Sequence, residues 1–287
     1  MPIESIKLEE FTVFKEIEIN CATGINVFIG ENGTGKTHLL KSVYSANKKE
    51  KEKYFTTKEV RLGEALIKGN NIDNVFIPSK DMLTHSESFM SINDKYDMPF
   101  DRTYYEVISK SLLPKLKETP EISKEIVAHL EKIIGGKVVV EKDVFYILQD
   151  GKCRRIEFAL ESEGIKKIAI LWQLIMNGTI EKNTGLFLDE PESNLNPKLI
   201  PELVQVLLEL ARNGVQIFIA THDYIFAKYI EVFARDSDNI TFHSLYKTEL
   251  GGVKCESSPT FRDLKHNVIV ESFDQLIQKV FDLNLGE

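Results

Sequence analysis

The sequence predicts an α/β fold in which a phosphate-binding loop meets the acidic end of a buried strand. Two observations carry this prediction. Gly30–Thr37 reads Gly-Glu-Asn-Gly-Thr-Gly-Lys-Thr, which fits the phosphate-loop pattern G-x-x-x-x-G-K-[ST]. Far downstream, the apolar run Leu186–Leu188 ends in the adjacent acids Asp189 and Glu190. Ligands of open α/β sheets gather at the carboxyl ends of the strands, so we expect both features at one edge of one sheet.

The phosphate-binding loop has the expected context, since Ile25–Ile29 reads as a strand before it and Thr37–Tyr44 as the start of a helix after it. Glycines let the backbone curl until its N–H groups point at phosphate oxygens, and the helix N-terminus adds a favourable field. Lys36 is expected to reach the β- and γ-phosphates, and the Thr37 hydroxyl to ligate Mg²⁺. The residues predicted to bind the nucleotide here are Gly30, Glu31, Asn32, Gly33, Thr34, Gly35, Lys36, Thr37 and His38.

The adjacent carboxylates suit a metal ion and a water molecule. We expect Asp189 to hold Mg²⁺ together with Thr37, and Glu190 to orient or deprotonate the attacking water. A surface Asp-Glu pair after a buried strand is the alternative interpretation. His222 follows the next apolar strand along the chain, the expected neighbour in a right-handed βαβ unit. We therefore expect His222 close to both acids and in contact with the γ-phosphate.

The segment Glu161–Lys167 allows two interpretations. Ser162 and Gly164 stand at the start of a predicted helix that stops at Asn177-Gly178. Ser162 could be an ordinary N-cap, which is the plain interpretation. The helix start could also bind the phosphates of a nucleotide that another protomer holds. The residues alone leave both interpretations open.

Composition limits the chain to a few broad classes. Of its 287 residues, 43% are hydrophobic and 28% charged, as in a globular protein with a sizeable core. The net charge of −8 gives no global basic field for nucleic acid, although a local patch could still bind DNA. Three widely spaced cysteines without a C-x-x-C pair suggest neither a disulfide framework nor a zinc site. With no secretory signal and no apolar run of roughly 18 residues, we expect a cytoplasmic protein without membrane insertion.

The other segments are predicted as packing elements. Two early strands should form an antiparallel flap beside the main sheet, and their Phe11 and Phe14 could either stack on a base or lie in the core. Residues 46–158 read as an inserted helical lobe with a small β-sheet. Predicted elements after the loop helix are a central strand at 74–78, a helix at 122–134, strands at 138–140, 144–148 and 155–158 with a turn at Asp150-Gly151, a breaker at Pro120, and a hairpin turning at 251–252.

Together these motifs resemble those of ABC-type ATPase heads, and within them the SMC, RecF and OLD-type group of AAA-family ATP-binding proteins. Gly30–Thr37 is similar to the Walker A motif and Leu186–Glu190 to Walker B with its catalytic Glu. Ser193–Pro197 resembles the D-loop, and Thr221–Asp223 the switch-histidine loop. Glu161–Gly164 resembles a degenerate signature motif.

The resemblance implies a P-loop NTPase with a mixed sheet flanked by helices. It implies a single ATPase domain over residues 1–287, with the lobe 46–158 inserted within it, and ATP hydrolysis with Mg²⁺. It also implies an ATP-dependent, head-to-tail homodimer in which Ser162 and Gly164 of one protomer face the γ-phosphate in the other. The residues that it implies for catalysis are Lys36, Glu190 and His222.

Several positions depart from the family pattern. Glu163 and Ile165 stand where the signature has Gly and Gln, Asn196 replaces the D-loop aspartate, and no Gln marks the loop after the strand at 74–78. The 64 residues after Asp223 are too few for the nuclease module of OLD-type proteins, so we expect a stand-alone ATPase subunit.

Three roles remain open. The first is a switch that acts on DNA or on a separate nuclease or toxin effector, as in bacterial antiviral defence or repair. The second is the nucleotide-binding subunit of a transporter, and the third is an ATP sensor or scaffold with little turnover.

Overall fold

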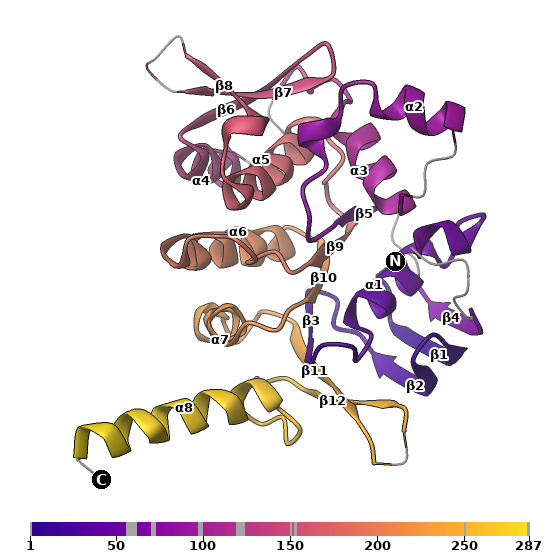
Figure 1. Ribbon diagram of the computed structural model, residues 1–287, viewed down its shortest axis with the longest axis vertical. Helices are drawn as coiled ribbons and strands as arrows, with labels where there is room; N and C mark the ends of the chain where they lie inside the picture. Colours follow the sequence, from indigo (N-terminus) through magenta and orange to yellow (C-terminus); the bar gives the residue numbers. More distant parts are fainter. Residues whose placement is uncertain are drawn as a thin grey trace.

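The predicted α/β fold is confirmed in the computed structural model (Figure 1). The structure describes residues 2–55, 62–69, 73–96, 100–118, 124–149, 151, 154–249 and 251–285. Predictions at Pro120, Ile122, Asp150 and Cys153 lie outside these residues. No helix within the described ranges is long and apolar enough to cross a membrane.

A six-stranded central sheet organises the molecule. β11, β3, β10, β9 and β5 run parallel to their neighbours, and the edge strand β12 pairs antiparallel with β11. The sheet is therefore mixed, as expected. In spatial order the strands are β12 (Val253–Ser258), β11 (Ile240–Lys247), β3 (Ile25–Gly30), β10 (Gln216–Ala220), β9 (Gly185–Asp189) and β5 (Asn74–Ile77).

The two faces of the central sheet carry different side chains. In β9, Leu186 and Leu188 face one core while Phe187 faces the other, because successive side chains of a strand point to opposite faces. The Phe187 ring stacks on Phe218 at 4.8 Å and on Phe76 at 6.5 Å between ring centroids. One face is thus mainly aliphatic and the other mainly aromatic, so both faces must be covered.

Helices cover the aliphatic face, and α1 with a small sheet covers the aromatic face (Figure 1). The helices of the aliphatic side carry the buried residues of the larger core. They are α4 (Lys124–Ile134), α5 (Glu163–Met176), α6 (Ile200–Arg212) and α7 (Tyr224–Phe233), followed by the C-terminal α8 (Val268–Leu285).

The predicted antiparallel flap is confirmed as a three-stranded sheet in the order β2-β1-β4. It packs with α1 against the aromatic face of the central sheet. Phe11 and Phe14 are 2% and 1% exposed, so both rings belong to the core and neither is free to stack on a base. The elements are β1 (Ser5–Phe11), β2 (Phe14–Asn20), β4 (Glu64–Lys68) and α1 (Lys36–Ser45).

The range 46–158 contributes to several parts of the molecule. Its β4 pairs with β1 and its β5 with β9, so both strands join sheets that begin outside the range. Further along, β6, β7 and β8 form a separate three-stranded sheet. The limits of an inserted lobe stay a prediction. The remaining elements are η1 (Lys51–Tyr54), η2 (Leu83–His85), α2 (Phe89–Tyr96), α3 (Arg102–Ser111), β6 (Gly136–Glu141), β7 (Val144–Gln149), β8 (Arg155–Glu157), η4 (Phe158–Leu160) and η5 (Pro197–Leu199).

Candidate functional site

The phosphate-binding loop joins the end of β3 to the start of α1 and leaves no room for side chains at Gly30 and Gly35. Gly30 has φ +145°, and a Cβ there would lie 2.2 Å from the Leu245 carbonyl oxygen. Gly35 has φ +86°, and a Cβ there would lie 2.5 Å from Val13 and 2.8 Å from Phe14. Positive φ and close approach both favour glycine, which explains these two positions of the motif.

Lys36 lies inside the curl of this loop. Its Nζ donates to the carbonyl oxygens of Gly30 at 2.7 Å and Glu31 at 3.0 Å. The side chain is largely buried, and burial lowers the pKa of its ammonium, while the nearby carboxylates of Glu190 and Asp189 act in the opposite direction. The structure therefore places a positive charge at the centre of a ring of backbone groups.

A hydrogen bond joins the start of α1 to the end of β9. The Thr37 hydroxyl donates to Oδ1 of Asp189 at 2.9 Å, across 152 positions of sequence. Burial raises the pKa of the Asp189 carboxyl, whereas this hydrogen bond lowers it. Two oxygen groups of the kind that Mg²⁺ prefers thus lie side by side beneath the loop.

Glu190 and His222 meet at the ends of adjacent strands. β9 and β10 are parallel neighbours with Asp189 opposite Ala220, and the Glu190 amide donates to the Ala220 carbonyl at 2.9 Å. Nδ1 of His222 lies 3.0 Å from Oε1 of Glu190, and both side chains remain partly exposed. Glu190 has φ +48°, which is rare for a residue with a side chain. The structure thus brings together Lys36, Thr37, Asp189, Glu190 and His222.

His38 contributes differently from its neighbours. Its ring packs edge-on against Phe55, with 5.6 Å between ring centroids, and burial lowers the pKa of the imidazole. The side chain of His38 is partly buried, and its role in nucleotide binding stays a prediction. Glu31, Asn32 and Gly33 are exposed at the tip of the loop, while the Thr34 hydroxyl donates to the Glu31 carbonyl at 2.9 Å and stiffens the curl.

Ser162 and Gly164 lie at the start of α5 and do not contact the loop residues through any bond in the described structure. Ser162 occupies the N-cap position, as the plain interpretation expects, but its exposed hydroxyl makes no capping hydrogen bond. Gly164 is buried, and a Cβ there would lie 2.7 Å from the Asn194 carbonyl oxygen and 2.8 Å from Cα of Leu195. Ser162 thus faces solvent, and Gly164 packs on the turn that follows β9.

Three buried polar residues beside the site were not predicted. The Thr221 hydroxyl donates to Oε1 of Glu192 at 2.5 Å and accepts the Asp223 amide, so it ties the turn after β9 to the loop that carries His222. Burial raises the pKa of Glu192 to about 7. Lys167 of α5 also reaches this turn. The sequence placed Thr221, Lys167 and Glu192 in or beside the predicted motifs, but it did not indicate which groups their side chains bond.

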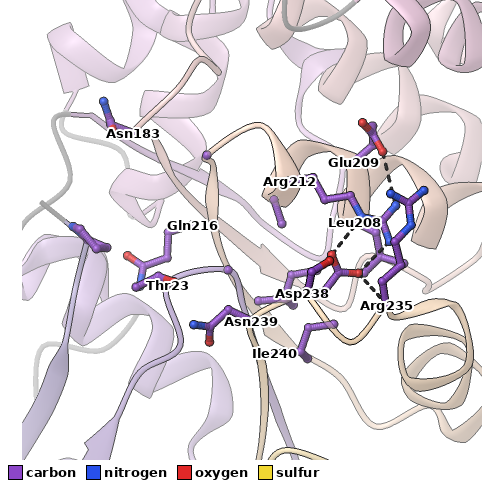
Figure 2. A pocket seen from close by; sticks show the side chains of 16 residues that line it. Thr23, Asn183, Leu208, Glu209, Arg212, Gln216, Arg235, Asp238, Asn239 and Ile240 are labelled. Atoms are coloured by element: carbon purple, nitrogen blue, oxygen red, sulfur yellow. Dashed lines mark hydrogen bonds and ion pairs between the residues drawn. The ribbon is translucent and has the colours of Figure 1, made fainter.

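A cavity lies at the opposite end of the sheet. It measures about 600 Å³ and is lined by the first residues of parallel strands, among them Ile25, Gln216 and Ile240 (Figure 2). There the Arg212 guanidinium binds the Asp238 carboxylate through two hydrogen bonds of 3.0 and 2.7 Å. Ligands of such sheets bind at the other ends of the strands, where an open groove of about 430 Å³ runs between the phosphate-binding loop, His222 and α8.

Comparison with known proteins identifies the family and the fold of this chain. Residues 44–227 match the family model described as "AAA domain, putative AbiEii toxin, Type IV TA system". The chain is 23% identical over 224 residues to the glutamine transport ATP-binding protein GlnQ of Bacillus subtilis, a match that covers 77% of this chain and 78% of GlnQ. It is 50% identical to the DNA replication and repair protein RecF of Cytophaga hutchinsonii, but over 44 residues, 15% of this chain and 12% of RecF.

A solved structure shows the same fold. It is the Smc head domain of Pyrococcus furiosus with an extended coiled coil, bound to the C-terminal domain of ScpA. The TM-score is 0.53 at 12% identity, and the match covers 97% of this chain and 99% of that chain.

Proposed function

We propose that this chain hydrolyses ATP where the loop 30–37 meets the ends of β9 and β10. The chain belongs to the AAA-domain family that matches residues 44–227, and it is an ATPase of the ABC and SMC type. The observation that carries the proposed site is the hydrogen bond between Thr37 and Asp189. It places the start of the loop helix directly against the acidic strand end, as an ATP-hydrolysing site requires.

Thr37 and Asp189 fit a magnesium ion. A hydroxyl and a carboxylate oxygen 2.9 Å apart, the latter nine-tenths buried, supply the hard oxygen ligands that Mg²⁺ takes beside phosphates. When bound, the ion would neutralise charge on the β- and γ-phosphate oxygens. No third oxygen ligand is assigned to it from this chain.

The remaining roles follow from position. The Nζ of Lys36 would exchange its bonds to the Gly30 and Glu31 carbonyls for bonds to phosphate oxygens, while the loop amides hold the rest of the triphosphate. Glu190 would accept a proton from the attacking water. The ring of His222, 3.0 Å from Glu190, would orient that carboxylate and contact the γ-phosphate. Each of these groups is held by the end of a buried strand or the start of a helix.

Phosphate release by the purified chain tests this site. With Mg²⁺ and ATP, Asp189→Asn should lower turnover roughly 10-fold or more, because it removes a charged metal ligand from a buried position. EDTA should abolish turnover of the unaltered chain. Asp236→Asn, a change of the same kind at an exposed position, serves as the control and should leave turnover unchanged. Equal rates for Asp189→Asn and the control would remove Asp189 from the site.

We further propose that ATP drives a head-to-tail homodimer that controls a separate effector protein or DNA. The exposed start of α5, with Ser162 uncapped, supports a partner that comes from outside the protomer. The Smc head of Pyrococcus furiosus is bound to a domain of ScpA, and RecF is a DNA replication and repair protein, so a protein or a DNA partner fits the relatives. We include in this proposal a role in bacterial defence and a location in the cytoplasm.

A transporter subunit is the second candidate function, favoured by the match to GlnQ over 77% of this chain. Turnover measured with and without double-stranded DNA separates the two. Stimulation by DNA supports the first role. Unchanged turnover with DNA, combined with stimulation by a membrane protein encoded beside this chain, supports the second.

A further inference from the structure

Lys167 is a buried lysine that the mechanism above does not use. It lies on α5, three residues after Gly164, and is 7% exposed. A lysine is almost never buried to this degree unless its ammonium is satisfied. The Lys167 ammonium therefore needs hydrogen-bond acceptors close to it.

Within the described residues, the hydrogen bonds of the Lys167 ammonium go to the turn after β9. Its Nζ donates to the Glu190 carbonyl oxygen at 2.8 Å, to the Ser193 carbonyl oxygen at 3.2 Å, and to the Ser193 hydroxyl. An ammonium has three N–H donors, so these acceptors use its full capacity. Burial lowers the pKa of Lys167, while the carboxylates of Glu192 and Glu190 raise it and favour the charged form.

The turn that Lys167 holds has an unusual backbone. Glu190 has φ +48° and Asn194 has φ +62°, both in the left-handed region that residues with a Cβ rarely adopt. Such conformations persist where the surroundings hold them in place. A bond to the Glu190 carbonyl oxygen therefore helps to set the direction in which the Glu190 side chain leaves the backbone, toward His222.

The start of α5 is in contact with the same turn. A Cβ on Gly164 would lie 2.7 Å from the Asn194 carbonyl oxygen, so the helix backbone and the turn touch directly. Lys167 adds charge-assisted hydrogen bonds to this contact. The start of α5 and the turn after β9 are thus joined at two points, one at Asn194 and one at Glu190 and Ser193.

We propose that Lys167 is a positioning residue that ties the backbone of Glu190 to α5, so that a γ-phosphate held by a second protomer against the start of α5 brings Glu190 into place for hydrolysis. The inference rests on the proposed function of Glu190 and of the head-to-tail dimer. Lys167 touches neither the nucleotide nor the water. It acts through the turn after β9, where it bonds the Glu190 carbonyl oxygen and two oxygens of Ser193.

The test compares two neighbouring lysines of α5. Lys167→Met removes the ammonium and keeps an unbranched side chain of similar length. Lys166→Met is the matched control, because Lys166 is also buried but pairs with Glu163 at 2.8 Å and Asp81 at 3.6 Å instead of the turn. We expect Lys167→Met to lower the single-turnover rate roughly 10- to 100-fold with ATP affinity within about 3-fold. The control should stay within about 3-fold in both quantities.

Lys167→Arg and Ser193→Ala keep the test decisive if Lys167→Met does not fold. Emission of Trp172, the single tryptophan of the chain, buried on α5, reports folding of each variant. Lys167→Arg retains a cation with several donors and should recover part of the lost rate. Ser193→Ala removes one acceptor and should lower the rate less than Lys167→Met. A folded Lys167→Met protein with the rate of the control would overturn the proposal.

A double variant separates positioning from a general structural role. If Lys167 acts only through Glu190, then Lys167→Met in a Glu190→Gln background should cause no further loss of rate. If the fold-losses of rate from Lys167→Met and Glu190→Gln multiply in the double variant, Lys167 does not act through Glu190. If Glu190→Gln alone hydrolyses ATP at the normal rate, the proposed function fails. If Glu190→Gln is inactive and Lys167→Met is normal, only the role of Lys167 fails.

Discussion

The strand-end site and the start of α5 differ in how far one chain completes them. At the strand ends, Thr37 bonds Asp189 and His222 contacts Glu190, so residues far apart in sequence already satisfy one another. At the start of α5, Ser162 is exposed and its hydroxyl caps nothing. The first region is preorganised by the sheet, which lowers the cost of ordering the site when a ligand binds. The second presents free backbone donors that another molecule would have to satisfy.

The largest effect should come from the strand-end site. Glu190→Gln keeps the shape of the side chain but removes the proton acceptor, so turnover should fall roughly 10²- to 10⁴-fold while ATP still binds. Single-turnover hydrolysis, measured beside a nucleotide titration, checks both parts. Normal turnover in this variant would show that the strand-end site does not use Glu190 as its proton acceptor.

The next effect concerns the phosphate-binding loop. Lys36→Ala removes the charge enclosed by the loop, so ATP affinity should fall roughly 30-fold or more and the thermal shift with Mg-ATP should vanish. Lys247→Ala is the control, since Lys247 is a lysine beside the loop that donates to the Asn32 carbonyl at 3.4 Å from an exposed position. A full thermal shift in Lys36→Ala would show that the loop does not hold the triphosphate.

A pH-dependent stability should arise from Glu192. Its folded pKa of about 7 lies above the ordinary value of 4.5, so between these pH values the folded state binds a proton that the unfolded state has lost. The free energy of unfolding should therefore fall as pH rises from about 4.5 to 7, by about 3 kcal/mol. Glu192→Gln should flatten this dependence and be the more stable protein at pH 8. Urea unfolding of both proteins at pH 5 and pH 8 measures this dependence. An equal change in the free energy of unfolding with pH for the two proteins would contradict the prediction.

The smallest effect compares two neighbours at the start of α5. Gly164→Ala puts a methyl group against the Asn194 carbonyl oxygen and should destabilise the fold by about 1–2 kcal/mol. Ser162→Ala should change stability by less than about 0.5 kcal/mol, because its hydroxyl makes no capping bond. Chemical denaturation of both variants distinguishes them. Equal stabilities would mean that Gly164 does not pack as described.

Much of the strand-end geometry was predictable from the sequence. The loop pattern locates Lys36 and Thr37, and the βαβ rule places His222 beside the acidic strand end, because parallel strands joined by one helix are neighbours. The 3.0 Å contact between His222 and Glu190 agrees with that placement. The roles of these residues stay predictions.

The buried polar contacts were not predictable. Nothing in the pattern of α5 distinguishes Lys166, which pairs with Asp81, from Lys167, which reaches the turn after β9. The direction of a buried polar side chain depends on partners that only tertiary packing supplies. For the same reason, Ser162 in a capping sequence could still be left without a capping bond.

The most direct test of the difference between the two regions is the mass of Glu190→Gln in solution by light scattering, with and without Mg-ATP. We expect a monomer without nucleotide and a dimer with ATP, since unhydrolysed ATP would bridge the loop of one protomer and the α5 start of the other. Adding Ser162→Asp, an exposed change that avoids the packed Gly164, should keep the protein monomeric by setting a carboxylate against the γ-phosphate. A monomer that has bound ATP, or a dimer that forms equally with Ser162→Asp, would contradict the account.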